Sequence, residues 1–229
     1  MTDYEDPSKP TSTILSPFTG NKDILKVVFH PGVTHIGDWA FQSCTNMKTA
    51  EFYGDMLSIG NWAFIGAGLT SLNLPESLQI VGTGAFEQCE RLEYVIVPDQ
   101  ADLGVAGRTF LYCYGLTQFV VSGSNARYTE RNGVLFSKDM KELIAWPAGK
   151  AGEYEIPDGV QEIWDYAFCC AQQLSAVTLP DSVQTIGYAA FERCPTLTEI
   201  TIPGSVQTDR KSTRLNSSHT RPSRMPSSA

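Results

Sequence analysis

The chain has 229 residues, 42% of them hydrophobic, and carries 25 acidic against 17 basic side chains. The resulting net charge of −8 argues against nucleic acid as a partner, because a phosphate backbone attracts basic surfaces. The length and apolar content are sufficient for one extended hydrophobic core, and no apolar run is long enough to insert into a membrane.

Three segments differ in composition. Residues 1–21 are polar and lack the basic and apolar regions of a signal peptide, whereas residues 22–206 carry regular repeats and form the predicted folded domain. Residues 207–229 contain no aromatic side chain and have a reversed charge, so we expect a disordered tail. Because residues 210–219 also resemble translated adaptor or vector sequence, we interpret this tail as non-native and the reading frame as truncated.

A short alternating segment opens each repeat and ends at a proline. In residues 69–75, Leu69, Leu72 and Leu74 precede Pro75, and residues 92–98, 174–180 and 197–203 follow the same pattern. Apolar residues at alternating positions predict a strand with one buried face. Because proline cannot donate a backbone hydrogen bond, strand pairing is expected to stop there.

A block with an alanine or threonine before a phenylalanine follows each alternating segment, usually after Ile-Gly. The phenylalanines of these blocks are Phe41, Phe64, Phe86, Phe110, Phe168 and Phe191. The first four are 22 to 24 residues apart, a period within the range of leucine-rich repeats. One such repeat is too small to be stable alone, so we expect a solenoid in which these rings stack in one buried column. Phe41 is expected to lie at the periphery of that column, where one of its neighbours packs less well than those of Phe86, so its truncation should cost less.

Four cysteines occupy one repeat position, three residues after the phenylalanine: Cys44, Cys89, Cys113 and Cys194. We interpret them as small buried side chains, because free cysteine packs like a small hydrophobic residue. The alternative is a ladder of stacked thiols that binds metal. The chain has no C-x-x-C pair among its six cysteines and only three scattered histidines, so we expect no metal site. The adjacent pair Cys169-Cys170 lies outside this repeat position.

These motifs, in one order and register over about residues 24–206, resemble the BspA-like leucine-rich repeats (type 5). The unit of that family is similar to L-x-x-[VI]-x-[IL]-P-x-x-[VL]-x-x-I-G-x-x-A-F-x-x-C. Three positions depart from it, because Ala67 and Ala171 replace the cysteine and Ala106 replaces the glycine. The resemblance implies an α/β-type repeat solenoid with units of about 23 residues. A parallel β-sheet would form one face, and turns with short helical segments the other.

The period breaks within residues 122–150. Asn132-Gly133 and the polar residues 137–142 separate two apolar runs, which predicts a β-hairpin. We expect a variant repeat whose strands continue the stack, as hairpin-bearing units do in similar arrays. A specialised binding excursion is the alternative.

No recognisable catalytic arrangement is present. The pairs Gly66-x-Gly68 and Gly82-x-Gly84 fall at turn positions and do not extend into a dinucleotide-binding motif. Trp39, Trp62 and Trp164 could form a sugar-stacking platform, but their near-identical repeat positions favour packing between repeats. We therefore expect a non-enzymatic protein without a cofactor, and a monomer.

The resemblance implies a cell-surface or secreted module that adheres to host proteins or glycans. The sequence itself establishes no localisation. The alternatives are an intracellular interaction scaffold, favoured by the missing signal peptide, and a repeat domain accessory to an enzyme in a larger protein.

Strand parity suggests where a ligand binds. If Leu92, Val95 and Val97 face the core, their alternating neighbours face solvent. Reading the strands as one ladder, we expect a ligand-binding face that contains Tyr94, Ile96, Gln118, Val120, Glu153 and Glu155. Exposed apolar groups on an open sheet favour contact with a ligand, and the acidic residues favour basic partners. Isolated exposed apolar side chains, which are ordinary on soluble proteins, are the alternative.

Overall fold

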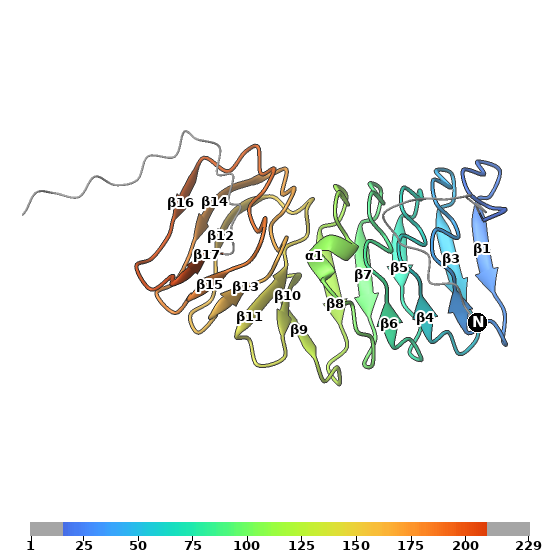
Figure 1. The fold of residues 1–229 in the computed structure, drawn as a ribbon, viewed down its shortest axis with the longest axis horizontal. Helices are drawn as coiled ribbons and strands as arrows, with labels where there is room; N and C mark the ends of the chain where they lie inside the picture. The colour runs from blue at the N-terminus through green and yellow to red at the C-terminus, as the bar shows by residue number, and fades with distance from the viewer. Residues whose placement is uncertain (1–15, 210–229) are drawn as a thin grey trace, which may run out of the picture.

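The computed structural model describes residues 16–209, which form an elongated stack of solenoid turns (Figure 1). Most repeats contribute one longer strand and one strand of two residues. The longer strands are β1 (Lys26–Phe29), β3 (Thr49–Phe52), β5 (Ser71–Asn73), β7 (Tyr94–Val97), β8 (Gln118–Val121), β12 (Gly152–Glu155), β14 (Leu174–Thr178) and β16 (Glu199–Thr201). They pair in parallel within three groups, β1-β3, β5-β7-β8 and β12-β14-β16.

The opposite wall is built from strands of two residues, which pair in parallel from turn to turn. These are β2 (His35–Ile36), β4 (Ser58–Ile59), β6 (Ile80–Val81), β13 (Glu162–Ile163), β15 (Thr185–Ile186) and β17 (Thr208–Asp209). Helical segments are fewer than the family resemblance implies, because the described residues contain a single helix, α1 (Ala106–Thr109). The repeat is therefore a β-solenoid with parallel strands on two sides.

The irregular unit contains the expected hairpin and a third strand. Strand β10 (Val134–Ser137) pairs antiparallel with both β9 (Tyr128–Arg131) and β11 (Glu142–Ala145). Strand β11 then pairs in parallel with β13, so it joins the wall of short strands. The unit thus continues the stack on one wall, and no strand pairing links β8 to β12 on the other.

The phenylalanine rings stack between repeats. Successive centroids from Phe41 to Phe64, Phe86 and Phe110 are 5.2, 5.5 and 5.7 Å apart, with interplanar angles of 10° or less. Phe18, 23 residues before Phe41, extends this column with a centroid distance of 5.2 Å. Phe41 is therefore not the end of the column as expected, because the repeat pattern begins before residue 22, although its outer neighbour Phe18 is 44% exposed.

The core divides into two hydrophobic clusters at the hairpin unit. One runs from Phe29 to Ala145 and the other from Val134 to Leu197. In the second cluster the indole of Trp146 lies 5.6 Å from the ring of Phe168, and Phe168 stacks on Phe191 at 4.9 Å. Trp146, 22 residues before Phe168, thus opens a second aromatic column. The single uninterrupted column that the repeats predict does not form.

Each of the four repeat cysteines uses its thiol in the same way. The Sγ atoms of Cys44, Cys89 and Cys113 donate to the carbonyl oxygens of Phe18, Phe64 and Phe86 over 3.0 to 3.3 Å. Cys194 donates to the Phe168 carbonyl in the same geometry. All six cysteines are free, and the described residues contain no cluster of three or more metal-ligating side chains. The repeat cysteine therefore links each turn to the preceding one.

Burial of these thiols makes stability sensitive to alkaline pH. Burial raises the pKa of the Cys89 thiol to about 12, whereas an unfolded cysteine loses its proton near a pH of about 8.5. Above that pH the unfolded chain gains stability by deprotonation, so the stability of the fold declines until pH reaches about 12. We expect the melting temperature to fall above a pH of about 9, and Cys89→Ala to reduce the slope of that decline. Circular dichroism melts between pH 7 and 11 would measure it, and identical slopes for both proteins would contradict the role of Cys89.

The wall of short strands continues beyond residue 206. Gln207 donates its backbone N–H to the carbonyl of Gln184, and β17 pairs with β15 in the register Thr185↔Thr208. Residues 207–209 thus continue the wall of short strands. The rest of the expected tail, residues 210–229, lies outside the described residues, as do residues 1–15 of the N-terminal segment.

Candidate ligand-binding face

Strands β5, β7 and β8 present one buried and one outward face. Val95 and Val97 are fully buried, whereas Tyr94 and Ile96, which alternate with them, are partly exposed. Neighbouring strands keep this alternation, because Leu72 and Phe119 pair with Val95 and are buried as well. The outward side chains therefore form columns across the three strands.

Two outward columns differ in character. One contains Ser71, Tyr94 and Gln118, and the other Asn73, Ile96 and Val120. Val120 is 41% exposed, which places an aliphatic surface beside the partly exposed Ile96 and the tyrosine ring. The structure thus brings together Tyr94, Ile96, Gln118 and Val120 on β7 and β8.

Glu153 and Glu155 lie on a different ladder. They pair with Ala176 and Thr178 of β14, and their own side chains are exposed. The single continuous face expected from the sequence is therefore wrong, because β12 starts a new group of strands after the hairpin unit.

The turn between β9 and β10 approaches both ladders. The carbonyl of Gly133 accepts the backbone N–H of Phe119 over 2.9 Å, and a side chain at Gly133 would collide with Gln118. On its other side, Arg131 and Asn132 line a hollow of about 230 Å³ together with Tyr154 and Glu155. The turn between β9 and β10 thus contacts the outward face of β7 and β8 on one side. On the other side it contacts the ladder that carries Glu153 and Glu155, here called the acidic ladder.

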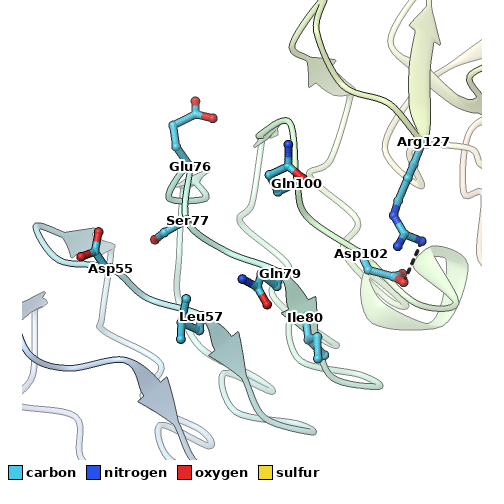
Figure 2. Close-up of a pocket in the computed structure, with 9 residues that line it drawn as sticks. All are labelled: Asp55, Leu57, Glu76, Ser77, Gln79, Ile80, Gln100, Asp102 and Arg127. Carbon is cyan, nitrogen blue, oxygen red and sulfur yellow. Dashed lines mark hydrogen bonds and ion pairs between the residues drawn. The ribbon is translucent and has the colours of Figure 1, made fainter.

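An open groove of about 800 Å³ lies on the side of the short strands (Figure 2). Residues on three successive turns and Arg127 of the hairpin unit line it, including Asp55, Glu76, Asp102 and the 60% exposed Ile80. Arg127 Nη1 contacts Asp102 Oδ2 at 3.1 Å, and both side chains are about half exposed. Sequence reasoning missed this groove, because strands of two residues show no readable alternation.

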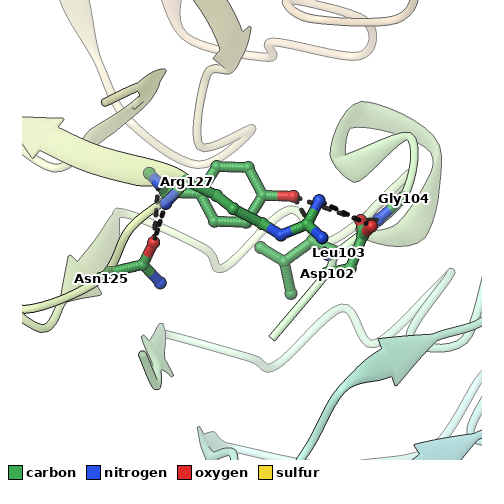
Figure 3. A network of polar contacts seen from close by, with 6 residues as sticks. Asp102, Leu103, Gly104, Asn125 and Arg127 are labelled. Atoms are coloured by element: carbon green, nitrogen blue, oxygen red, sulfur yellow. Dashed lines mark hydrogen bonds and ion pairs between the residues drawn. The ribbon is translucent and has the colours of Figure 1, made fainter. Parts of the chain in front are cut away.

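The hairpin unit is attached to the preceding repeat by side chains (Figure 3). Asn125, fully buried, donates from Nδ2 to the carbonyl of Pro98 over 2.7 Å. Its Oδ1 accepts the backbone N–H groups of Arg127 and Tyr128 at 2.8 and 2.7 Å. The hydroxyl of Tyr128 accepts the N–H of Leu103. These contacts join residues 125–128 of the hairpin unit to the preceding repeat, and Leu103 and Tyr128 both belong to the first core cluster.

The tryptophans pack between repeats. Trp39 and Trp62 stack at 4.7 Å with an interplanar angle of 15°, and Trp62 Nε1 donates to Glu87 at 3.1 Å. Gly84 on the next turn has a φ of +64°, and a side chain there would collide with the Trp62 indole. Trp62 therefore lies between Trp39 and Gly84, and its ring faces are not free for a sugar.

The chain belongs to the BspA type leucine-rich repeat region family, which matches residues 15–132 and 149–228 in six copies. The match therefore includes the turn of Phe18 and leaves out residues 133–148 of the hairpin unit. Proteins of this kind are protein-binding repeat modules. Within the described residues, no helix combines the length and hydrophobicity of a membrane span.

Several solved structures share the fold. A leucine-rich repeat protein from Eubacterium ventriosum is 26% identical with a TM-score of 0.69, over 81% of this chain and 56% of that protein. The pneumococcal vaccine antigen PcpA is 24% identical (TM-score 0.64), over 80% of this chain and 51% of the antigen. A leucine-rich cell surface protein from Faecalibacterium prausnitzii is 22% identical (TM-score 0.51), with 79% and 61% covered. The chain thus spans less than two thirds of each of these proteins. No curated protein matches the sequence significantly.

Proposed function

We propose that this chain is a non-enzymatic recognition module of a cell-surface or secreted protein. It binds host proteins or glycans through the outward face of β7 and β8. The observation that carries the proposal is the cluster of Tyr94, Ile96 and Val120 on an open face of paired strands. Aromatic and aliphatic groups on such a face supply the anchors that protein interfaces use.

The surface location is also part of this proposal. Two proteins of the same fold are described as a vaccine antigen and as a cell surface protein. The alternative, an intracellular scaffold, has no structural observation that favours it. The six free thiols do not supply one, because the repeat cysteines donate to backbone carbonyls and Cys169 contacts Cys170. Protease treatment of intact cells would separate the two, since only a surface protein is cleaved without lysis.

The acidic ladder has a separate role in the proposal. Glu153 and Glu155 lie outside the apolar cluster and attract basic ligands over a distance. Charged groups of this kind raise association rates, and salt screens their effect. Apolar anchors mainly slow dissociation.

The two roles predict different kinetic changes. We expect the double variant Tyr94→Ser/Ile96→Thr to weaken binding roughly 10- to 100-fold through faster dissociation, because it removes the central apolar anchors. Glu153→Gln/Glu155→Gln is the matched control. It should slow association at low salt and leave association at high salt unchanged. Surface plasmon resonance against a panel of host matrix proteins and glycans measures both rates. Undiminished binding by a correctly folded Tyr94→Ser/Ile96→Thr protein would place the site elsewhere.

A further inference from the structure

The adjacent cysteines Cys169 and Cys170 have no role in the repeat. They lie one and two residues after Phe168, whereas the repeat position for cysteine in this turn holds Ala171. The four repeat cysteines each donate to a phenylalanine carbonyl of the preceding turn. In contrast, the Sγ atoms of Cys169 and Cys170 lie 3.6 Å apart and contact each other. Packing of the solenoid therefore does not explain this pair.

The backbone places both thiols on the same side of the turn. Cys170 has a φ of +64°, in the left-handed region, and its N–H donates to the carbonyl of Glu192 on the next turn. Adjacent residues in extended or helical backbone direct their side chains apart, so this conformation is what allows the two sulfur atoms to meet. Each sulfur has to move by less than about 1 Å to reach the disulfide bond length of about 2 Å.

The surroundings of the pair favour a reactive thiol. Tyr112, Cys170 and Arg193 occupy the same repeat position, and Arg193 Nη1 donates to the Tyr112 hydroxyl over 2.8 Å. The guanidinium also lies 5.6 Å from the centre of the Tyr112 ring. The hydrogen bond between the two thiols and the charge of Arg193 lower the pKa of Cys170, whereas the same hydrogen bond and burial raise the pKa of Cys169. Cys170 is thus the thiol that ionises first.

The two thiols are buried, whereas the neighbouring charged side chain is exposed. Cys169 and Cys170 are 8% and 1% exposed, but the side chain of Arg193 is 63% exposed. A small oxidant would have to reach the pair through local motion of such exposed side chains, which takes picoseconds to nanoseconds. Cys89 and Cys113 are fully buried, and burial raises the pKa of both thiols.

We infer that Cys169 and Cys170 form a reversible oxidation site, at which a hydroperoxide converts the two thiols into a disulfide between adjacent residues. The Cys170 thiolate attacks one oxygen of hydrogen peroxide and becomes a sulfenic acid, while the other oxygen leaves as hydroxide and is protonated to water. The Cys169 sulfur then attacks the Cys170 sulfur, and the sulfenic hydroxyl leaves with the thiol proton as a second water. Two electrons pass from the thiols to the peroxide, which is reduced to two waters.

The product is expected to be easily reduced. Adjacent Cα atoms are about 3.8 Å apart, below the usual Cα separation of a disulfide, so the bond is strained. Strained disulfides have more oxidising potentials and are the labile ones. A dithiol reductant should therefore restore both thiols under native conditions.

The test is mass spectrometry of the full chain after treatment with a small excess of hydrogen peroxide. We expect a loss of about 2 Da, which corresponds to two thiol hydrogens, confined to the peptide of Cys169 and Cys170. Titratable thiols should fall from six to four, and dithiothreitol should restore them.

Single variants identify the role of each thiol. Cys169→Ser should stop the reaction at a sulfenic acid that dimedone traps at Cys170, and Cys170→Ser should abolish oxidation of the pair. Cys113→Ser, which alters a repeat cysteine, is the matched control and should leave the loss of about 2 Da unchanged. An unreactive pair in the unsubstituted protein would overturn the inference. Oxidation spread equally over Cys44, Cys194 and the pair would overturn it as well.

Discussion

Replacing Phe86 with alanine is expected to lower the free energy of unfolding by about 3 to 5 kcal/mol, the range for buried aromatic residues. Phe86 is fully buried and stacks on Phe64 at 5.5 Å and on Phe110 at 5.7 Å. Its removal leaves a cavity between two rings that belong to different turns, and neither turn can close the gap without shifting its own strands. Urea denaturation followed by circular dichroism would measure the loss.

Phe18→Ala is the matched control, because Phe18 holds the same repeat position at the end of the column. It is 44% exposed and stacks only on Phe41 among the described rings. Its loss should therefore cost clearly less than that of Phe86. Equal costs for the two variants would show that stacking between turns does not determine stability at this position.

Most of the repeat architecture could be predicted from the sequence, because each turn repeats the same local chemistry. The spacing of Phe64 and Phe86, and the alternation around Val95, determine which side chains face inward. Phe18 lies at the same spacing from Phe41, but the residues around Phe18 lack the Ile-Gly and Ala-Phe pattern. The signal for this additional turn is therefore one aromatic residue at the repeat period.

The wall of short strands could not be predicted in the same way. A strand of two residues shows no alternation, and its pairing partners lie in the neighbouring turns rather than in the local sequence. The open groove beside Ile80 and Asp102 depends on this wall. The cysteine pattern was informative about burial, yet the thiol hydrogen bonds to phenylalanine carbonyls depend on the exact stacking of turns.

The candidate face was predicted in part. Residues on paired strands, such as Ile96 and Val120, are neighbours because their repeats are adjacent and regular. The sequence predicts the same ladder for Glu153 and Glu155, because it does not reveal that the hairpin unit continues only the wall of short strands. Long-range pairing of an irregular unit is decided by tertiary contacts, which a repeat pattern does not contain.

Asn125→Ala is expected to destabilise the protein by about 3 to 5 kcal/mol, because it leaves two backbone N–H groups and one carbonyl without partners in or near the core. These are the N–H groups of Arg127 and Tyr128 and the carbonyl of Pro98. An unsatisfied buried polar group costs about 1 to 3 kcal/mol of folding stability, whereas an intact hydrogen bond contributes a smaller net amount. Differential scanning calorimetry would measure the loss.

Arg127→Ala is the matched control at the same boundary between the hairpin unit and the preceding repeat. It removes the contact with Asp102, in which both partners are about half exposed, and such ion pairs contribute under about 1 kcal/mol. If the boundary is held by the buried amide, Asn125→Ala should lower the melting temperature far more than Arg127→Ala. The reverse order would mean that the surface ion pair holds the hairpin unit to the preceding repeat. The boundary would then weaken with added salt, because salt screens exposed charges and leaves the buried hydrogen bonds of Asn125 largely unaffected.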